Sequence, residues 1–311
     1  MALEQVSTDF LRRYIGRQLT RLRENARTAE GKHPTQAQAA QAFGVGRSTM
    51  IRMEEGVDGV KFPEPNVKAL LDYYGASATD RDLILSLTAE TRERRNGRAW
   101  WHDYTEPSLP TWFSQYVMLE DSAVSIRQYE SELVPGLLQI QEYAQILART
   151  PAGYVSEERV SDLVRVRMDR QALLDRDDEK APPPRLEVII GEAAIRRPFA
   201  DPEIIGRQLQ HLLDAGARRR ISVRILPATV GVHGGMVSNP FSLLEFPAGK
   251  NGEPMEQPLA YMDTLTGSLY MSKPEEVAAY ELVWRDLKKN ALNTTESQEL
   301  IRSAMMEGLS R

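Results

Sequence analysis

The period of the hydrophobic residues changes along this chain, and that change constrains the fold more than any other feature. Up to about residue 95, apolar side chains recur every three or four residues, as in helices with one buried face. After residue 184 they occur in short runs typical of strands, such as RLEVII, ISVRILP and FSLLEF. A chain of 311 residues is also long for one domain. We therefore expect an all-α domain over residues 1–95 and an α+β domain over residues 96–311.

Five helices are expected in the first domain, and helices followed by a mostly antiparallel sheet in the second. The first five patterns cover 10–26, 35–43, 46–56, 66–75 and 79–95, with Thr35 and Asn66 as N-caps. A linker begins at Asn96 and Gly97. In the second domain, helices are expected at 136–150, 156–176, 201–218 and 273–292, and strands at 185–190, 221–227, 241–246, 259–265 and 267–271.

The composition excludes several classes of site. Cysteine is absent, which excludes disulfides, thiolate catalysis and cysteine-bound metals, and the four histidines are scattered. We therefore expect neither a metal site nor a cofactor. No apolar run approaches the roughly 18 residues of a membrane helix, and the first residues lack the apolar core of a signal peptide. A cytoplasmic, nucleoid-associated protein without a membrane partner is expected.

The charge is distributed unevenly. The chain has a net charge of −5, but residues 1–62 carry ten basic residues against seven acidic ones. That segment is therefore at +3, which leaves −8 for the remainder. A modestly basic segment is compatible with binding to phosphates, whereas the acidic remainder repels DNA.

Residues 35–56, TQAQAAQAFGVGRSTMIRMEEG, have the features of a helix-turn-helix. Ala39 and Ala40 are small enough for two helices to cross closely, and Gly44 permits the sharp turn between them. The polar residues left on the outer face of the second helix are Arg47, Ser48, Thr49 and Arg52. Arginines placed in this way bind guanine O6 and N7 in the major groove, each bidentate contact contributing about 1–3 kcal/mol of discrimination. The alternative is a helical hairpin inside a larger core.

This segment resembles the DNA-binding core of the XRE family, the lambda/434 repressor-like regulators. The family pattern has Thr-Gln first, Leu-Gly-Val-Ser at the turn and Ser-Thr-Ile-x-Arg-x-Glu-x-Gly in the recognition helix. The resemblance implies an all-α lambda-repressor-like fold in which Arg47, Ser48 and Arg52 contact base edges. Gln36 and Thr49 fall at positions that contact the DNA backbone, and the dipole of the helix that Gln36 begins favours a phosphate there.

The same resemblance implies a structural pair and shows two departures. Arg23 and Glu54 fall at positions whose side chains tie the first helix to the third. Gly46 stands where a capping serine is usual. The connection RTAEGKHP is longer than usual, and Lys32 or His33 within it is a candidate for a further phosphate contact.

The second domain resembles DUF5753, a domain of unknown function carried by many actinobacterial XRE regulators. The similarity lies in segments such as WFSQYVMLEDSAVSIRQYESELVPGLLQIQEYAQIL, GVHGGMVSNPFSLLEF and YMDTLTGSLYMSKPEEVAAYELVWRDL. Some of these regulators are described as antitoxin-type, and many are encoded beside a small DUF397-type protein. The resemblance implies a transcription regulator whose second domain binds a small-molecule effector or a small partner protein.

Candidate residues for that second site are aromatic or acid–base groups. Trp100, Trp101 and Trp112 fit the lining of a ligand pocket or a partner groove, although such residues more often anchor a fold. His233 lies in a glycine-rich segment, and with Glu192 and Asp263 it forms the one set that resembles acid–base machinery. No nucleophile elbow or phosphate loop accompanies the set, so we expect no enzyme.

The sequence thus predicts a DNA-binding transcription regulator of the repressor type. We expect a homodimer bound to double-stranded operator DNA, because one domain contacts too few base pairs for useful specificity. An effector or partner would act through different affinities for two arrangements of the dimer. The alternative is an antitoxin-like protein that sequesters a DUF397-type partner and regulates its own synthesis. A hydrolase tethered to DNA is the more distant alternative.

Overall fold

The computed structural model describes residues 6–28, 30–57, 59–93, 99–104, 109–152, 155–177, 179, 181–198, 201–249 and 252–309. They form two compact units, each of which is described by itself. Unit 1 comprises residues 1–99 with 247–256, and unit 2 comprises residues 100–246 and 257–311. The predicted linker residues Asn96 and Gly97 lie outside the described residues. The sequence does not indicate that 247–256 packs with the helical unit.

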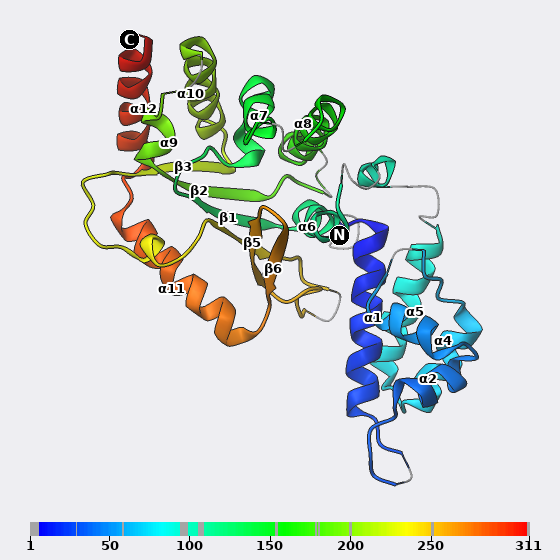
Figure 1. Cartoon of the computed structure of the whole chain (residues 1–311). Helices are drawn as coiled ribbons and strands as arrows, with labels where there is room; N and C mark the ends of the chain where they lie inside the picture. The colour runs from blue at the N-terminus through cyan, green and yellow to red at the C-terminus, as the bar shows by residue number, and fades with distance from the viewer. Residues whose placement is uncertain are drawn as a thin grey trace. The chain divides into compact units, whose positions relative to one another are not determined.

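Unit 1 contains the five predicted helices (Figure 1). They are α1 (Thr8–Asn25), α2 (Gln36–Phe43), α3 (Arg47–Glu54), α4 (Glu64–Tyr73) and α5 (Ala78–Glu93). The core forms where α1 buries its apolar stripe, including Phe10, Leu11 and Ile15, against the other helices. Within the same unit, the buried carboxylate of Glu256 accepts a hydrogen bond from Arg13 Nε at 2.5 Å and pairs with Arg17.

Asn66 does not cap α4, so that prediction was wrong. The helix begins two residues earlier, with Pro63 as its N-cap and Pro65 in its first turn. Proline is favoured there because its ring fixes φ and the missing N–H has no helical partner at that position. Asn66 Nδ2 instead donates to the Phe43 carbonyl oxygen at 2.6 Å. This bond satisfies the carboxyl end of α2, immediately before the turn into α3.

Unit 2 is built on a six-stranded mixed sheet with strand order β3-β2-β1-β4-β5-β6. The strands are β1 (Ser125–Glu130), β2 (Arg185–Gly191), β3 (Ile221–Leu226), β4 (Phe241–Glu245), β5 (Leu259–Thr264) and β6 (Gly267–Met271). Strands β1, β2 and β3 are parallel, whereas β4, β5 and β6 pair antiparallel. The prediction of a mostly antiparallel sheet is therefore correct only for the half that contains β4, β5 and β6. The central strand β1 was not predicted, because SIRQYE is largely polar.

The helices of unit 2 cover both faces of this sheet. They are α6 (Thr111–Ser122), α7 (Gln141–Ala148), α8 (Glu157–Gln171), α9 (Glu192–Arg196), α10 (Pro202–Gly216), α11 (Pro274–Asn290) and α12 (Thr294–Leu309). Figure 1 shows α12, α10, α7 and α8 in a row on one side and α11 on the other. Helix α7 begins later than expected, since 136–138 forms a 3₁₀ turn, and α12 was not predicted. Across the described residues, no helix has the length and apolar character needed to cross a membrane.

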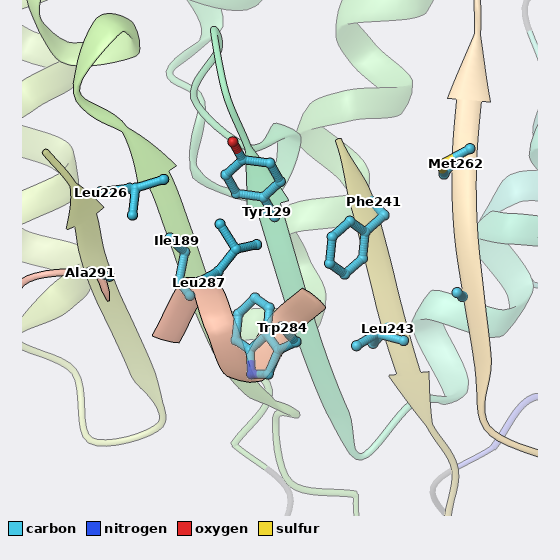
Figure 2. Close-up of a cluster of buried hydrophobic side chains, with 10 residues drawn as sticks. Tyr129, Ile189, Leu226, Phe241, Leu243, Met262, Trp284, Leu287 and Ala291 are labelled. Atoms are coloured by element: carbon cyan, nitrogen blue, oxygen red, sulfur yellow. The ribbon is translucent and has the colours of Figure 1, made fainter. Parts of the chain in front are cut away.

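A hydrophobic core joins α11 to the sheet. Trp284 and Leu287 of α11 are 2% and 0% exposed and lie against the middle strands (Figure 2). Their partners include Tyr129 of β1, Ile189 of β2 and Phe241 of β4. Because side chains alternate along a strand, the neighbours of Tyr129 in β1, Gln128 and Glu130, point to the opposite face of the sheet.

Candidate nucleic-acid interface

The helix-turn-helix has the close crossing that its sequence predicts. Ala39, Ala40, Met50 and Met53 are all buried, and α2 packs directly on α3. Gly44 ends α2 at φ 79°, in the left-handed region that glycine enters without steric cost. At the start of α2 the Thr35 hydroxyl accepts from Gln38 N, and the Gln38 side chain accepts from Thr35 N. This capping box satisfies amides of the first turn and fixes where α2 begins.

The outer face of α3 is polar and open to solvent. Its exposed side chains are Arg47, Ser48, Thr49 and Arg52. Among the described residues, neither arginine forms an ion pair, so both guanidinium groups are available to an outside partner. Gly46 is the N-cap of α3 and has no side chain that could accept a hydrogen bond. The first backbone N–H groups of α3 therefore have no capping side chain as a partner.

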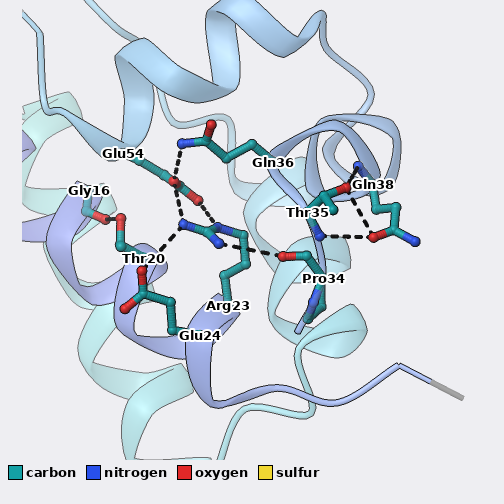
Figure 3. A network of polar contacts seen from close by, with 9 residues as sticks. All are labelled: Gly16, Thr20, Arg23, Glu24, Pro34, Thr35, Gln36, Gln38 and Glu54. Carbon is teal, nitrogen blue, oxygen red and sulfur yellow. Dashed lines mark hydrogen bonds and ion pairs between the residues drawn. The ribbon is translucent and has the colours of Figure 1, made fainter. Parts of the chain in front are cut away.

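A buried ion pair holds α3 against α1. Arg23 of α1 donates to Glu54 of α3 through Nε at 2.6 Å and through Nη2 at 3.0 Å (Figure 3). Gln36 Nε2 of α2 donates to the same carboxylate at 2.8 Å, and Arg23 Nη1 reaches the Pro34 carbonyl at 3.4 Å. The hydrogen bond that Arg23 donates to Glu54 raises the pKa of Arg23. One buried carboxylate thus ties together all three helices that position the exposed face.

Gly16 brings the backbones of α1 and α3 close together, a feature that sequence reasoning missed. A Cβ atom at this position would overlap the carbonyl oxygens of Met53 and Glu54. A larger residue would therefore push α3 away from α1 or break the end of α3. A glycine inside an amphipathic helix pattern is the signal from which such a close approach could have been predicted.

The remaining predicted contacts lie at the edge of this face. Gln36 begins α2 as expected, but its amide nitrogen is already bonded to Glu54. In the long connection between α1 and α2, Lys32 is exposed and His33 Nδ1 lies 2.7 Å from Arg27 Nη1. The connection therefore places basic side chains near the amino end of α2.

Two family matches cover most of the chain. The model of a helix-turn-helix domain matches residues 15–84, which contain the larger part of α1, the turn, all of α2 to α4 and the start of α5. The model of DUF5753, a domain of unknown function, matches residues 113–303, more than half of the chain. The chain belongs to the DUF5753 family. With the helix-turn-helix match it is a DNA-binding regulator that carries a C-terminal DUF5753 domain. A comparison with curated proteins found no match.

The candidate tryptophans of the DUF5753 unit form ring contacts with their neighbours in the chain. Trp101 is buried at 5% exposure and lies edge-on to Trp100, with ring centroids 5.7 Å apart. Trp112 lies beside Phe113, and its carbonyl oxygen accepts from Tyr270. Their assignment to a ligand or partner site therefore stays a prediction.

The three acid–base candidates of the DUF5753 unit are divided between two cavities. His233 and Glu192 line one of them, and the buried Nδ1 of His233 has no hydrogen-bond partner among the described residues. Glu192 pairs with Arg196 and accepts from Ala228 N at 2.7 Å. Asp263 lines a different cavity. In the part of the chain that is described, no group of three or more histidine or acidic side chains is placed to hold a metal ion.

Proposed function

We propose that this regulator reads operator DNA with α3 in the major groove. The observation that carries the proposal is the exposed face of α3, where the two arginines Arg47 and Arg52 lie without an ion pair among the described residues. Both guanidinium groups are free to form bidentate bonds with guanine. Ser48 is assigned to base edges, and Thr49 and Gln36 to the DNA backbone. The buried Arg23–Glu54 pair supports the geometry without touching DNA.

The DUF5753 unit is proposed to bind an effector or a small partner protein, and the protein to act as a homodimeric repressor. A dimer places two recognition helices about 34–36 Å apart on adjacent half-sites, which gives the specificity that one helix lacks. The antitoxin-like role with a DUF397-type partner is the second candidate, and it rests on family resemblance. The absence of catalysis is also part of the proposal, and the separation of Asp263 from His233 supports it.

Arg47→Ala and Arg52→Ala should each weaken binding to the preferred duplex. That duplex is first selected from a random library with the purified protein. Loss of one bidentate contact is expected to cost about 1–3 kcal/mol and to relax the base preference at one position. Binding is measured by fluorescence anisotropy at several salt concentrations, because the phosphate contribution depends strongly on salt.

Arg92→Ala is the matched control for these variants. Arg92 carries the same charge in the same unit, its side chain is 58% exposed, and it lies on α5 away from α3. It should keep affinity within about twofold of the parent. Parent affinity in both α3 variants, or no retention of any duplex at low salt, would refute the proposed docking.

A further inference from the structure

Unit 2 contains a polar cavity on the face of the sheet opposite the α11 core. Its volume is about 500 Å³, in the range of small-molecule sites. The walls come from the carboxyl end of β1, the start of β4, the end of β5, helix α8 and the segment 133–139. Gln128 and Glu130 point into it because they alternate with the buried Tyr129. Tyr261 and Asp263 of β5 line it from the other side.

The strand order places β1 between the two halves of the sheet. From β1 the chain goes to β2 and β3 on one side and then returns to β4 on the other side of β1. The carboxyl end of β1 therefore lies where the parallel half of the sheet meets the antiparallel half. The antiparallel register places Phe241, at the start of β4, opposite Tyr129, so β4 begins at this cavity.

Charged groups of both signs face the cavity without pairing. Arg167 of α8 donates from Nη1 to Gln139 Oε1 at 2.9 Å, and Glu130 accepts from Gln128 Nε2 at 3.1 Å. Among the described residues, no ion pair joins Arg167 to Glu130 or to Asp263. Burial lowers the pKa of Arg167 to about 10, and burial together with the Asp263 carboxylate raises the pKa of Glu130 to about 8. The folded unit thus holds the half-buried Arg167 without an ion pair to either acid, beside a Glu130 carboxyl that is largely protonated at neutral pH.

One wall of the cavity is rigid. Arg170 of α8, 8% exposed, donates to Glu120 through Nε at 2.7 Å and through Nη2 at 2.8 Å. Its guanidinium lies over the rings of Phe113 and Tyr116, 5.0 and 5.5 Å from their centroids. Because Glu120 neutralises Arg170, Arg167 is the cation left for a ligand. The aromatic rings supply an apolar surface beside it.

We propose that this cavity binds a zwitterion of amino acid or dipeptide size. Its carboxylate would bond to Arg167, its ammonium group would face Glu130 and Asp263, and its apolar part would lie on the aromatic wall. An anion without an ammonium group would bring a second negative charge beside Asp263 and would supply no cation that favours ionisation of Glu130. A cation without a carboxylate would be repelled by Arg167 and would leave that guanidinium unpaired. A ligand with both charges gives the half-buried Arg167 a carboxylate partner and places its ammonium group beside the half-buried Glu130 and the exposed Asp263.

The site is independent of the DNA-binding assignment, but its regulatory consequence rests on the proposed effector function. A zwitterion that bridges α8, β1 and β5 would stiffen the centre of unit 2. It changes operator affinity only if it binds two arrangements of the regulator with different affinities.

Isothermal titration of the full chain without DNA tests the site. The probes are each of the twenty L-amino acids and the dipeptides Gly-Leu and Gly-Phe. At least one should bind saturably with a Kd of about 1 mM or lower. For the best probe, the analogue without its amino group and the analogue without its carboxylate should each bind at least about tenfold more weakly.

Two variants locate the binding, and one serves as a control. Arg167→Gln and Glu130→Gln should each weaken the zwitterion at least about tenfold, and Arg167→Gln should remove the preference for a carboxylate. Arg165→Gln changes the same charge on the same helix, but Arg165 is 63% exposed and does not line the cavity, so affinity should be unchanged. Circular dichroism confirms that each variant is folded.

Three results would overturn this site: no saturable binding of any probe, equal affinity for an analogue with one charge, or parent affinity in Arg167→Gln. None of these results bears on the proposal that α3 contacts DNA, because the titration contains no DNA. Conversely, Arg47→Ala should bind the best probe with parent affinity even where it loses the operator. The two proposals therefore fail separately.

Discussion

Arg23→Met should destabilise unit 1 by about 3–5 kcal/mol, the cost of leaving a buried carboxylate without its cation. The Glu54 side chain is 4% exposed, and Arg23 supplies two of its hydrogen bonds. Among the described residues Gln36 would remain as its one side-chain partner, and a neutral amide does not balance the charge. Because α3 is positioned through this carboxylate, operator affinity should fall together with stability. Urea denaturation followed by circular dichroism measures the loss.

Two companion variants separate the buried charge from a general effect of substitution. Lys68→Met breaks an exposed pair with Glu64, in which the side chains are 52% and 40% exposed, and should cost less than about 1 kcal/mol. Arg23→Met combined with Glu54→Met removes both charges and should recover much of the lost stability. If Arg23→Met alone has an unfolding free energy within about 1 kcal/mol of the parent, Arg23 does not hold Glu54 in the folded protein.

Glu130→Gln should make the protein more stable than the parent at pH 9, by about 2–4 kcal/mol. Burial raises the pKa of Glu130 from 4.5 to about 8, with Asp263 of β5 adding to the rise and Gln128 of β1 and Arg167 of α8 opposing it. The folded state therefore holds this proton more tightly than the unfolded state. The stabilisation is fully present below pH 4.5, declines as the pH rises and is lost above about pH 8. Glutamine is never charged, so the variant lacks this decline.

The measurement is the difference in unfolding free energy between parent and variant at pH 5, 7 and 9. Groups that do not interact with Glu130 titrate equally in both proteins and cancel. Glu157→Gln is the control, because Glu157 is 73% exposed and Arg149 lowers its pKa, so it stays ionised throughout this range. A difference that does not grow with pH would mean that Glu130 is solvated in the folded protein.

Local patterns in the sequence carry a large part of this structure. The helices of unit 1 follow from apolar residues at helical spacing, and the turn follows from Gly44 after the alanine-rich helix α2. The capping role of Thr35 is equally local, because the groups it bonds lie three residues away. Asn66 shows the limit of such reasoning. The sequence pattern predicts that Asn66 caps the helix that follows it. Its side chain instead bonds to the Phe43 carbonyl at the end of α2, which is distant in sequence.

The sequence by itself determined the two fold classes and the face of α3 that carries Arg47 and Arg52, because periodicity and turn chemistry act over a few residues. Only the tertiary structure decided that the polar segment Ser125–Glu130 is the central strand and that Arg167, Glu130 and Asp263 share a cavity. The physical reason is that strand pairing and helix packing join residues far apart in the chain. A buried charge has no local signature until its neighbours are known.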